Sequence, residues 1–477
     1  MSDQPQNLTA RKLSTSTKIY YGIAALGSAT VSGIYAAMLT IFYQDYLGLP
    51  AHWIGIAFAV YAVWNAINDP IFGQITDRTR SRLGRRIPYL RFTAPFFAVT
   101  FSLVWFAPQN APDVTQFVWM LVTMLLYDTC YTIIGLVHGA LMPELSESDQ
   151  ERGQLSISSS LFGLLGTMIG FIIPDLFRPK AGSVSTSLFG LQMSMVAVGV
   201  IAAFLIILTT YKVKEHREFS LVDEPVGWWP ALKYTFTSKS FLIFVVMNFM
   251  ATFMFSICMG AIYYLADYVT QGGTMPVLIS LFVPLALGIP ETQLVLRRME
   301  AVKAMQLYLV LTAIGLISLG FLPSNWVLAG IAVVGLGYSG VLVITYLLLG
   351  QVIDEDEIRT GVRREGSYLG ANALVTKPAQ SLAGYLTAAV LAATHFVTRE
   401  SNGGMIFLNQ PESALFGIRA VVGIIPGVAM LIGALVLHWY PIHGKRLQTV
   451  KETILRMHAE KQQRLQEMDA GVREASE

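Results

Sequence analysis

The sequence predicts an all-α membrane protein with twelve transmembrane helices in two pseudo-symmetric bundles of six. Of its 477 residues, 54% are hydrophobic and only 13% are charged, whereas a soluble chain carries about 25% charged residues. The apolar residues gather in segments of roughly 20 residues, the length that crosses a bilayer. Both cysteines lie inside such segments, so neither a disulfide framework nor a zinc site is indicated.

Twelve apolar stretches are candidates for spanning helices. The third and the ninth are short, so their ends are the least well defined. The twelve stretches cover approximately residues 20–44, 51–76, 92–107, 114–142, 155–177, 187–211, 241–269, 275–296, 304–322, 325–351, 367–396 and 415–441.

The longest internal connection, residues 212–240, is charged and separates the first six stretches from the last six. We therefore predict an N-terminal bundle over 20–211 and a C-terminal bundle over 241–441. Two six-helix halves are typical of secondary transporters built from repeats, which bind substrate near the membrane midplane. The polar N-terminal segment 1–19 lacks the apolar core of a cleaved signal peptide, and the tail 442–477 is polar.

Basic residues are distributed unevenly along the connections. Of the 33 Lys and Arg residues, 28 lie in the even-numbered connections and the two terminal segments. The other five are Arg178, Lys180, Lys377, Arg399 and Arg419. Because cytoplasmic loops carry the excess of Lys and Arg, both termini are predicted to be cytoplasmic, in a multi-pass protein of the plasma (inner) membrane.

One stretch, residues 64–91, combines these features. It starts inside the second spanning segment, where Asp69 follows Asn65 and Asn68, and it ends in an arginine-rich loop. An ionisable side chain at membrane depth is costly to bury and marks a functional site by default. The stretch therefore predicts a buried cation or proton site next to a charged cytoplasmic loop.

Three motifs together resemble one known family. They are NDPIFGQITDRTRSRLGRRIPY, YDTCYTIIGLVHGALMPELSESDQERGQLS and DEDEIRTGVRREGSYLGANALVTKPAQSLAG. They are similar to signatures of the glycoside–pentoside–hexuronide:cation symporters, of which the melibiose permease is the best-known member, within the major facilitator superfamily. Because the motifs are spread over both halves, the resemblance covers essentially the whole chain, and it implies the major facilitator fold.

The resemblance also implies a cation site on the second and fourth spanning helices. Asn68 and Asp69 match the family pattern in helix 2, and Thr132 matches in helix 4. Asn65 stands where sugar-transporting members often carry a second aspartate. Lys377 in helix 11 matches a lysine of the family site.

Several sugar-site positions depart from the melibiose-type pattern. Gly135 stands where those members carry an aspartate, and Gly139 stands where they carry a tryptophan. Ser160 replaces a sugar-binding arginine, and Ser28 with Ala29 replaces a Lys-Asp pair. The resemblance therefore implies a solute:cation symporter more strongly than it implies galactoside transport.

From the residues themselves we expect Asp69, Asn65, Asn68 and Thr132 to supply oxygen ligands to a hard cation such as sodium. A protonated Asp69 is the alternative, because burial favours the neutral carboxyl group. A further alternative is a structural Asp69 that hydrogen-bonds neighbouring helices and binds no ion. The substrate-lining candidates are Lys377, Tyr131, Asp128 and Gly135. Asp128 precedes Gly135 by two helical turns, so whether it replaces the missing carboxylate there is left open.

Oppositely charged loops predict a cytoplasmic gate. Loop 2–3 is basic, loop 4–5 is mainly acidic, and loop 10–11 is mixed. Each exposed ion pair contributes only about 0–1 kcal/mol, yet a network of them biases two states that differ by a few kcal/mol. The alternative is that these charges are orientation signals alone. The gate candidates are Arg78, Arg82, Arg85, Arg86, Arg152, Asp354, Asp356 and Arg363.

Taken together, the sequence predicts cation-coupled symport of a small polar solute, a sugar or glycoside, by alternating access. The alternative keeps the scaffold and carries an amphiphile such as a lysophospholipid. The chain contains no HExxH, nucleophile-elbow or P-loop pattern, so no enzyme is predicted. We expect a monomer in the bilayer, with no nucleic-acid partner and no cofactor beyond the coupling sodium ion or proton.

Overall fold

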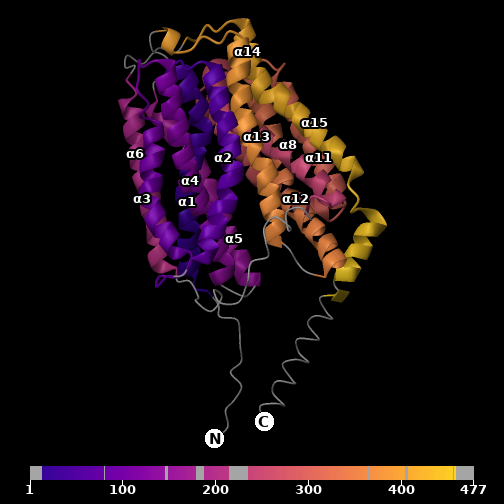
Figure 1. The fold of residues 1–477 in the computed structure, drawn as a ribbon. Coiled ribbons are helices and arrows are strands. Elements are labelled where there is room, and N and C mark those ends of the chain that lie inside the picture. The colour runs from indigo at the N-terminus through magenta and orange to yellow at the C-terminus, as the bar shows by residue number, and fades with distance from the viewer. Residues whose placement is uncertain are drawn as a thin grey trace, which may run out of the picture. The chain divides into compact units, whose positions relative to one another are not determined.

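The computed structural model is helical along its described length (Figure 1). The residues that it describes are 13–79, 81–145, 149–178, 187–213, 235–361, 365–402, 407–454 and 456–457. Each predicted spanning stretch coincides with a helix. By length and composition, eleven helices among these residues are long and apolar enough to cross a membrane, and the remaining predicted stretch is helix α13. The prediction of an all-α membrane protein is confirmed.

The first six spanning helices have simple boundaries. They are α1 (Thr15–Thr40), which continues as the π-helical η1 (Ile41–Tyr46), α2 (Ala51–Arg78), α3 (Ile87–Val104), α4 (Asp113–Leu145), α5 (Asp149–Phe177) and α6 (Phe189–Lys212).

The later helices are interrupted more often. They are α8 (Lys239–Gly260), α9 (Ile262–Tyr264), η3 (Leu265–Thr270), α10 (Thr274–Leu296), α11 (Ala301–Leu319), η4 (Ser324–Trp326), α12 (Val327–Thr360), α13 (Glu365–Ala393), η5 (Glu400–Asn402), α14 (Glu412–Arg419), η6 (Ala420–Ile424), α15 (Ile425–Val436) and η7 (Leu437–Trp439).

The chain forms two compact units. The first contains residues 1–224, 256–278 and 381–421, and the second contains the remaining residues. Two segments of the later half therefore belong to the first unit. In that unit Gln44 of η1 donates a hydrogen bond to the carbonyl of Ala388 in α13 (2.9 Å).

Small residues let the helices of the first unit approach closely. Helix α1 packs against α5 and α6, and α3 packs between α4 and α6. At the α1–α5 contact a Cβ added at Gly170 would lie 2.5 Å from the carbonyl oxygen of Thr30, and one at Gly33 would lie 3.1 Å from that of Thr167. This close backbone contact is typical of membrane helices, whose interfaces are enriched in small residues.

Glycines also lie at the helix contacts of the second unit. Helix α11 packs against both α12 and α15. A Cβ at Gly315 would lie 2.9 Å from the backbone nitrogen of Val334, and one at Gly427 would lie 2.5 Å from the side chain of Ile317. Glycines at these contacts therefore set the distances between the helices.

Candidate functional site

A buried carboxylate connects α2 and α4, which pack side by side in the first unit. Asp128 is only 2% exposed. Its Oδ1 accepts a hydrogen bond from the Tyr61 hydroxyl (3.0 Å), and its Oδ2 accepts one from Nδ2 of Asn68 (3.0 Å). A buried charge persists only when it is paired or hydrogen-bonded, and these two donors meet that requirement in part.

A third contact fixes the register of the two helices. Trp64 Nε1 donates to the hydroxyl of Thr129 at 3.2 Å. Residues 61, 65 and 68 lie on one face of α2, because residues three, four and seven apart share a face. Asn65 therefore lies between the two side chains that bind Asp128, and Thr132 lies one turn further along α4.

Four oxygen atoms around this carboxylate are buried and, across the described residues, have no hydrogen-bond partner. They are Asn65 Oδ1, Asn68 Oδ1, Thr132 Oγ1 and the hydroxyl of Tyr35. Burying such a group without a partner costs about 1–3 kcal/mol each. Several in one place point to a ligand that binds oxygen.

Aromatic rings enclose the same region. Tyr35 of α1 stacks on Tyr127 of α4, with ring centroids 4.3 Å apart. Tyr127 in turn stacks on Tyr131 at 5.9 Å. These rings and Tyr61 keep the carboxylate away from solvent.

The two halves of α4 expose different faces. The N-terminal half exposes an apolar strip of Val114, Val118, Val122 and Leu126. At about 100° per residue, Tyr131 is rotated by roughly 140° from Leu126, and Gly135 follows it on the same side. A Cβ at Gly135 would meet nothing within 4 Å. This second face therefore borders open space at Gly135, and the lining of a substrate path by these residues stays a prediction.

The predicted site residues fall into three groups. Asn65, Asn68 and Thr132 are buried together with Asp128, so the structure brings these four into one cluster. Asp69 is partly buried on α2. Lys377 is partly buried on α13 in the second unit. The roles of these residues in binding stay predictions.

The predicted gate residues lie in different units. Arg86 is buried and donates from Nη1 to the hydroxyl of Thr76 at 3.1 Å, while Arg82 is exposed and Arg85 partly buried in the same unit. Asp354 and Asp356 lie on α12 in the second unit. The side chains of Arg78, Arg152 and Arg363 lie outside the described residues, and the gate stays a prediction.

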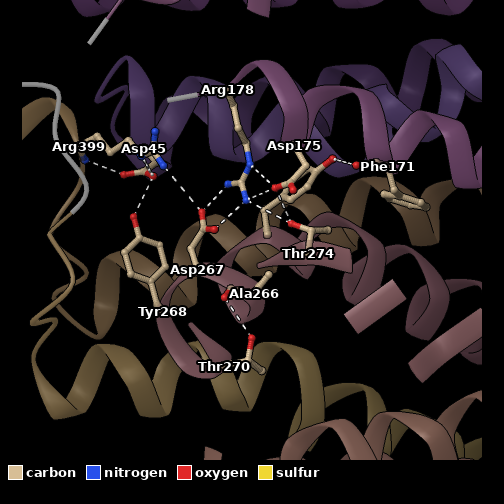
Figure 2. A network of polar contacts seen from close by, with 11 residues as sticks. Asp45, Phe171, Asp175, Arg178, Ala266, Asp267, Tyr268, Thr270, Thr274 and Arg399 are labelled. Atoms are coloured by element: carbon tan, nitrogen blue, oxygen red, sulfur yellow. Dashed lines mark hydrogen bonds and ion pairs between the residues drawn. The ribbon is translucent and has the colours of Figure 1, made fainter. Parts of the chain in front are cut away.

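A second polar network, which the sequence analysis did not identify, lies at the opposite end of α1 from the N-terminus (Figure 2). Arg178, just after α5, donates from Nη2 to Asp175 Oδ1 (2.7 Å) and to Asp267 Oδ1 (2.7 Å). Thr274, the first residue of α10, donates to the same oxygen of Asp175 at 2.7 Å. The hydrogen bonds of Arg178 therefore connect the end of α5 to η3 and α10.

The other half of this network centres on Asp45 in η1, which is fully buried. Its Oδ1 accepts from the backbone nitrogen of Arg399 (2.6 Å), and its Oδ2 lies 3.3 Å from the Arg399 Nε. The Tyr268 hydroxyl donates to Oδ2 at 3.2 Å, and Arg399 also lies near Asp267 (3.8 Å). We call Asp45, Asp175, Arg178, Asp267, Thr274 and Arg399 the clamp.

Both arginines of the clamp remain charged. Burial by itself lowers the pKa of Arg178, but the attraction of Asp267 and its other partners outweighs burial, and the pKa lies well above its usual range. The pKa of Arg399 is likewise raised by Tyr46 and Asp45 against the opposing effect of burial. Each guanidinium also lies over a tyrosine ring, at 4.5 Å for Arg178 on Tyr263.

The sequence contains only a weak indication of the clamp, namely the positions of its two arginines. Arg178 and Arg399 are among the few basic residues outside the predicted cytoplasmic segments. Asp175 lies three residues before Arg178, but the other carboxylate partners are far away in the chain: Asp267 is 89 residues from Arg178, and Asp45 is 354 residues from Arg399. Such pairings depend on tertiary structure alone.

Comparison with known proteins finds relatives that match most of this chain, among them the following three. A symporter of Synechocystis named sll1374 is 26% identical, over 92% of this chain and 96% of its own length. The sodium-dependent lysophosphatidylcholine symporter 1 of Xenopus tropicalis is 23% identical, over 93% and 90%. The isoprimeverose transporter of Lactiplantibacillus pentosus is also 23% identical, over 90% and 88%.

Solved structures of transporters share the fold. The D-xylose–proton symporter superposes with a TM-score of 0.59 at 15% identity, over 88% of this chain and 97% of its own. The sequence model of the MFS/sugar transport protein family matches residues 20–444. Because this match covers most of the chain, the protein belongs to the MFS/sugar transport protein family, as its resemblance to the glycoside–pentoside–hexuronide:cation symporters predicted.

Proposed function

We propose that this protein is a secondary active transporter that carries a sugar or glycoside together with a cation by alternating access. The observation that carries the proposal is the buried cluster of Asp128, Asn65, Asn68 and Thr132, because oxygen atoms without partners next to a carboxylate form a cation site inside a transporter fold. Relatives named as symporters support cation coupling. The substrate crosses unchanged, so the protein catalyses no covalent step.

The substrate class is proposed from two lines of support. The isoprimeverose transporter is named for a sugar, and the family is one of sugar transport proteins. In this chain, tyrosines near the cluster provide rings on which a sugar stacks, and Tyr131 is 36% exposed.

An amphiphile is the second candidate substrate. One relative is named as a lysophosphatidylcholine symporter. The open space at Gly135 and Gly139, where a Cβ would meet nothing within 4 Å, leaves room for a bulkier and more apolar substrate than a polar sugar site with side chains there.

The transporter lies in the plasma (inner) membrane as a monomer with both termini in the cytoplasm. The bias of 28 of 33 basic residues toward the even-numbered connections and the terminal segments supports this orientation. The clamp then faces the outside, and its closed state blocks access from that side. Opening the clamp and closing the opposite side would complete one half of the transport cycle.

Reconstitution tests the proposal. The purified full chain is placed in liposomes, and uptake of a labelled sugar panel and a labelled lysolipid panel is measured with and without an inward sodium or proton gradient. Sugar accumulation that follows a cation gradient is the expected result, and empty liposomes are the control. Lysolipid uptake alone selects the second candidate. No gradient-driven uptake of either panel contradicts the proposal.

A further inference from the structure

We infer that a polar pocket in the second unit binds a phosphate-bearing anion, with Lys239, Arg359 and Arg446 as its cationic contacts. The pocket has a volume of about 520 Å³, which lies within the range of small-molecule sites. Its lining residues all belong to the second unit. The pocket is therefore separate from the buried cluster around Asp128 and from the clamp, both of which lie in the first unit.

Three segments of the chain form the walls of the pocket. They are the start of α8 with the residues just before it, the end of α12, and a helix over residues 444–454 that we call the C-terminal helix. Each segment supplies one basic side chain, namely Lys239, Arg359 and Arg446. Leu447 and Ile454 are buried, so the C-terminal helix packs by its apolar side. Side chains distant in sequence thus meet around one cavity.

The two carboxylates of the pocket already have partners. Glu355 accepts a hydrogen bond from the Ser240 hydroxyl and forms an ion pair with Arg446. Asp356 is 4% exposed, and its Oδ1 lies 4.0 Å from Nη2 of Arg359. The three cations of the lining exceed its two carboxylates by one positive charge, so the pocket attracts an anion.

Lys239 carries the positive charge that remains. It is exposed, and within the described residues its ammonium group makes no hydrogen bond or ion pair. The side chains of Arg359 and Arg446 are 49% and 58% exposed, and exposed ion pairs contribute little stability. Both guanidinium groups can therefore turn from their carboxylates to a ligand at little cost.

The donors of the pocket favour a phosphate group. A guanidinium group donates two parallel hydrogen bonds to phosphate, and a lysine ammonium group adds a point charge. A phosphate monoester offers three acceptor oxygens and more than one negative charge. Thr453 lies on the same face of the C-terminal helix as Arg446, seven residues later, and adds a hydroxyl donor. A metal cation would instead be repelled by the basic side chains.

The role that follows for the site is regulation. The anion would connect α8, α12 and the C-terminal helix, and it would compete with Asp356 for Arg359. Because Asp356 is one of the predicted gate residues, binding changes the charge next to that residue.

Thermal unfolding of the purified full chain tests the site with two sources of phosphate. The soluble source is inorganic phosphate, compared with chloride at equal ionic strength. The lipid source is dioleoylphosphatidic acid in detergent micelles, compared with dioleoylphosphatidylcholine. A ligand that binds the folded state raises Tm, and we expect a saturable rise with at least one source. A rise with inorganic phosphate assigns a soluble anion, and a rise with phosphatidic acid alone assigns a lipid headgroup.

Variants of exposed basic residues separate the site from general salt effects, since phosphate also stabilises proteins by exclusion from their surface. Lys239→Gln and Arg446→Gln remove exposed side chains, so both should keep the Tm measured in chloride. Their midpoints for the active source should rise at least about tenfold. The matched control is Lys451→Gln, an exposed position about 140° around the C-terminal helix from Arg446, which should keep the parent midpoint.

Two results overturn the inference. One is the absence of a saturable rise with either source of phosphate. The other is a midpoint for Lys239→Gln that equals the parent value or that of Lys451→Gln. Because the measurement follows unfolding and not uptake, a failure of the proposed symport leaves this test unaffected.

Discussion

Removing the guanidinium of Arg399 is expected to open the clamp. In the structure Arg399 is 2% exposed and faces Asp45, which is fully buried. After Arg399→Gln, the backbone nitrogen of residue 399 and the Tyr268 hydroxyl still bind Asp45, but the carboxylate loses its countercharge. Breaking a buried pair by removing one partner costs about 3–5 kcal/mol.

The remaining hydrogen bonds place the cost near the lower end of that range, at about 3 kcal/mol. Only the closed clamp bears this cost, because an opened clamp exposes Asp45 to water. About 1.4 kcal/mol changes an equilibrium tenfold, so the ratio of open to closed molecules should rise about 100-fold. The change concerns the conformational equilibrium and not the cation site.

Cysteine labelling of the purified full chain in detergent measures this ratio. The probe is Ala266→Cys, which replaces a fully buried residue directly before Asp267 in η3, in a chain whose two native cysteines are replaced by alanine. A membrane-impermeant maleimide should label this cysteine much faster in Arg399→Gln than in the parent. The matched control is Ser401→Ala, whose hydroxyl bonds only locally to residue 398. An unchanged labelling rate in a folded Arg399→Gln protein would refute the reasoning.

Three further predictions follow from single contacts. Gly170→Val should lower Tm, because its Cβ would lie 2.5 Å from a carbonyl oxygen of α1, and this overpacking should cost about 1–3 kcal/mol or more of stability. Gly163→Ala, whose Cβ would meet nothing within 4 Å, should leave Tm unchanged, and equal Tm values for the two variants would contradict the packing argument. Thr274→Val should destabilise the protein by about 1–3 kcal/mol, because it removes the hydrogen bond to Asp175. Thr270→Val, which loses a hydrogen bond to a carbonyl of the same helical segment, should leave the stability unchanged, and denaturation of both variants in detergent compares them. Asp69→Asn should abolish gradient-driven accumulation in liposomes, because it removes the carboxylate predicted to bind the coupling cation or proton, and accumulation at the parent rate would count against a coupling role.

The spanning helices could be predicted from the sequence, because the thickness of the bilayer sets the length of each apolar segment. A segment such as 187–211 must satisfy its backbone internally in lipid, which only a helix or a closed barrel allows. The structure places α6 at Phe189–Lys212, within two residues of the prediction. The expected importance of Asn65, Asn68 and Thr132 likewise came from sequence, since polar side chains at membrane depth are rare.

Sequence analysis could not predict which residues contact Asp128. Asp128 and Asn68 are separated by 60 residues, and their contact depends on the register of α2 against α4. That register is set by side-chain contacts such as Trp64 with Thr129, which no periodicity encodes. Sequence analysis therefore left the role of Asp128 open.

The amino-acid order alone determined which segments lie in the membrane and the family to which the chain belongs, because hydrophobic length, charge bias and motif spacing are local properties. Tertiary structure alone decided which buried charges meet. Asp45 and Arg399 are separated by 354 residues, and they pair because helix packing removes both from water, where an unpaired charge is costly. The local sequence therefore predicts the spanning helices, whereas the contacts of the clamp and the cluster of buried oxygens near Asp128 form only when the helices pack.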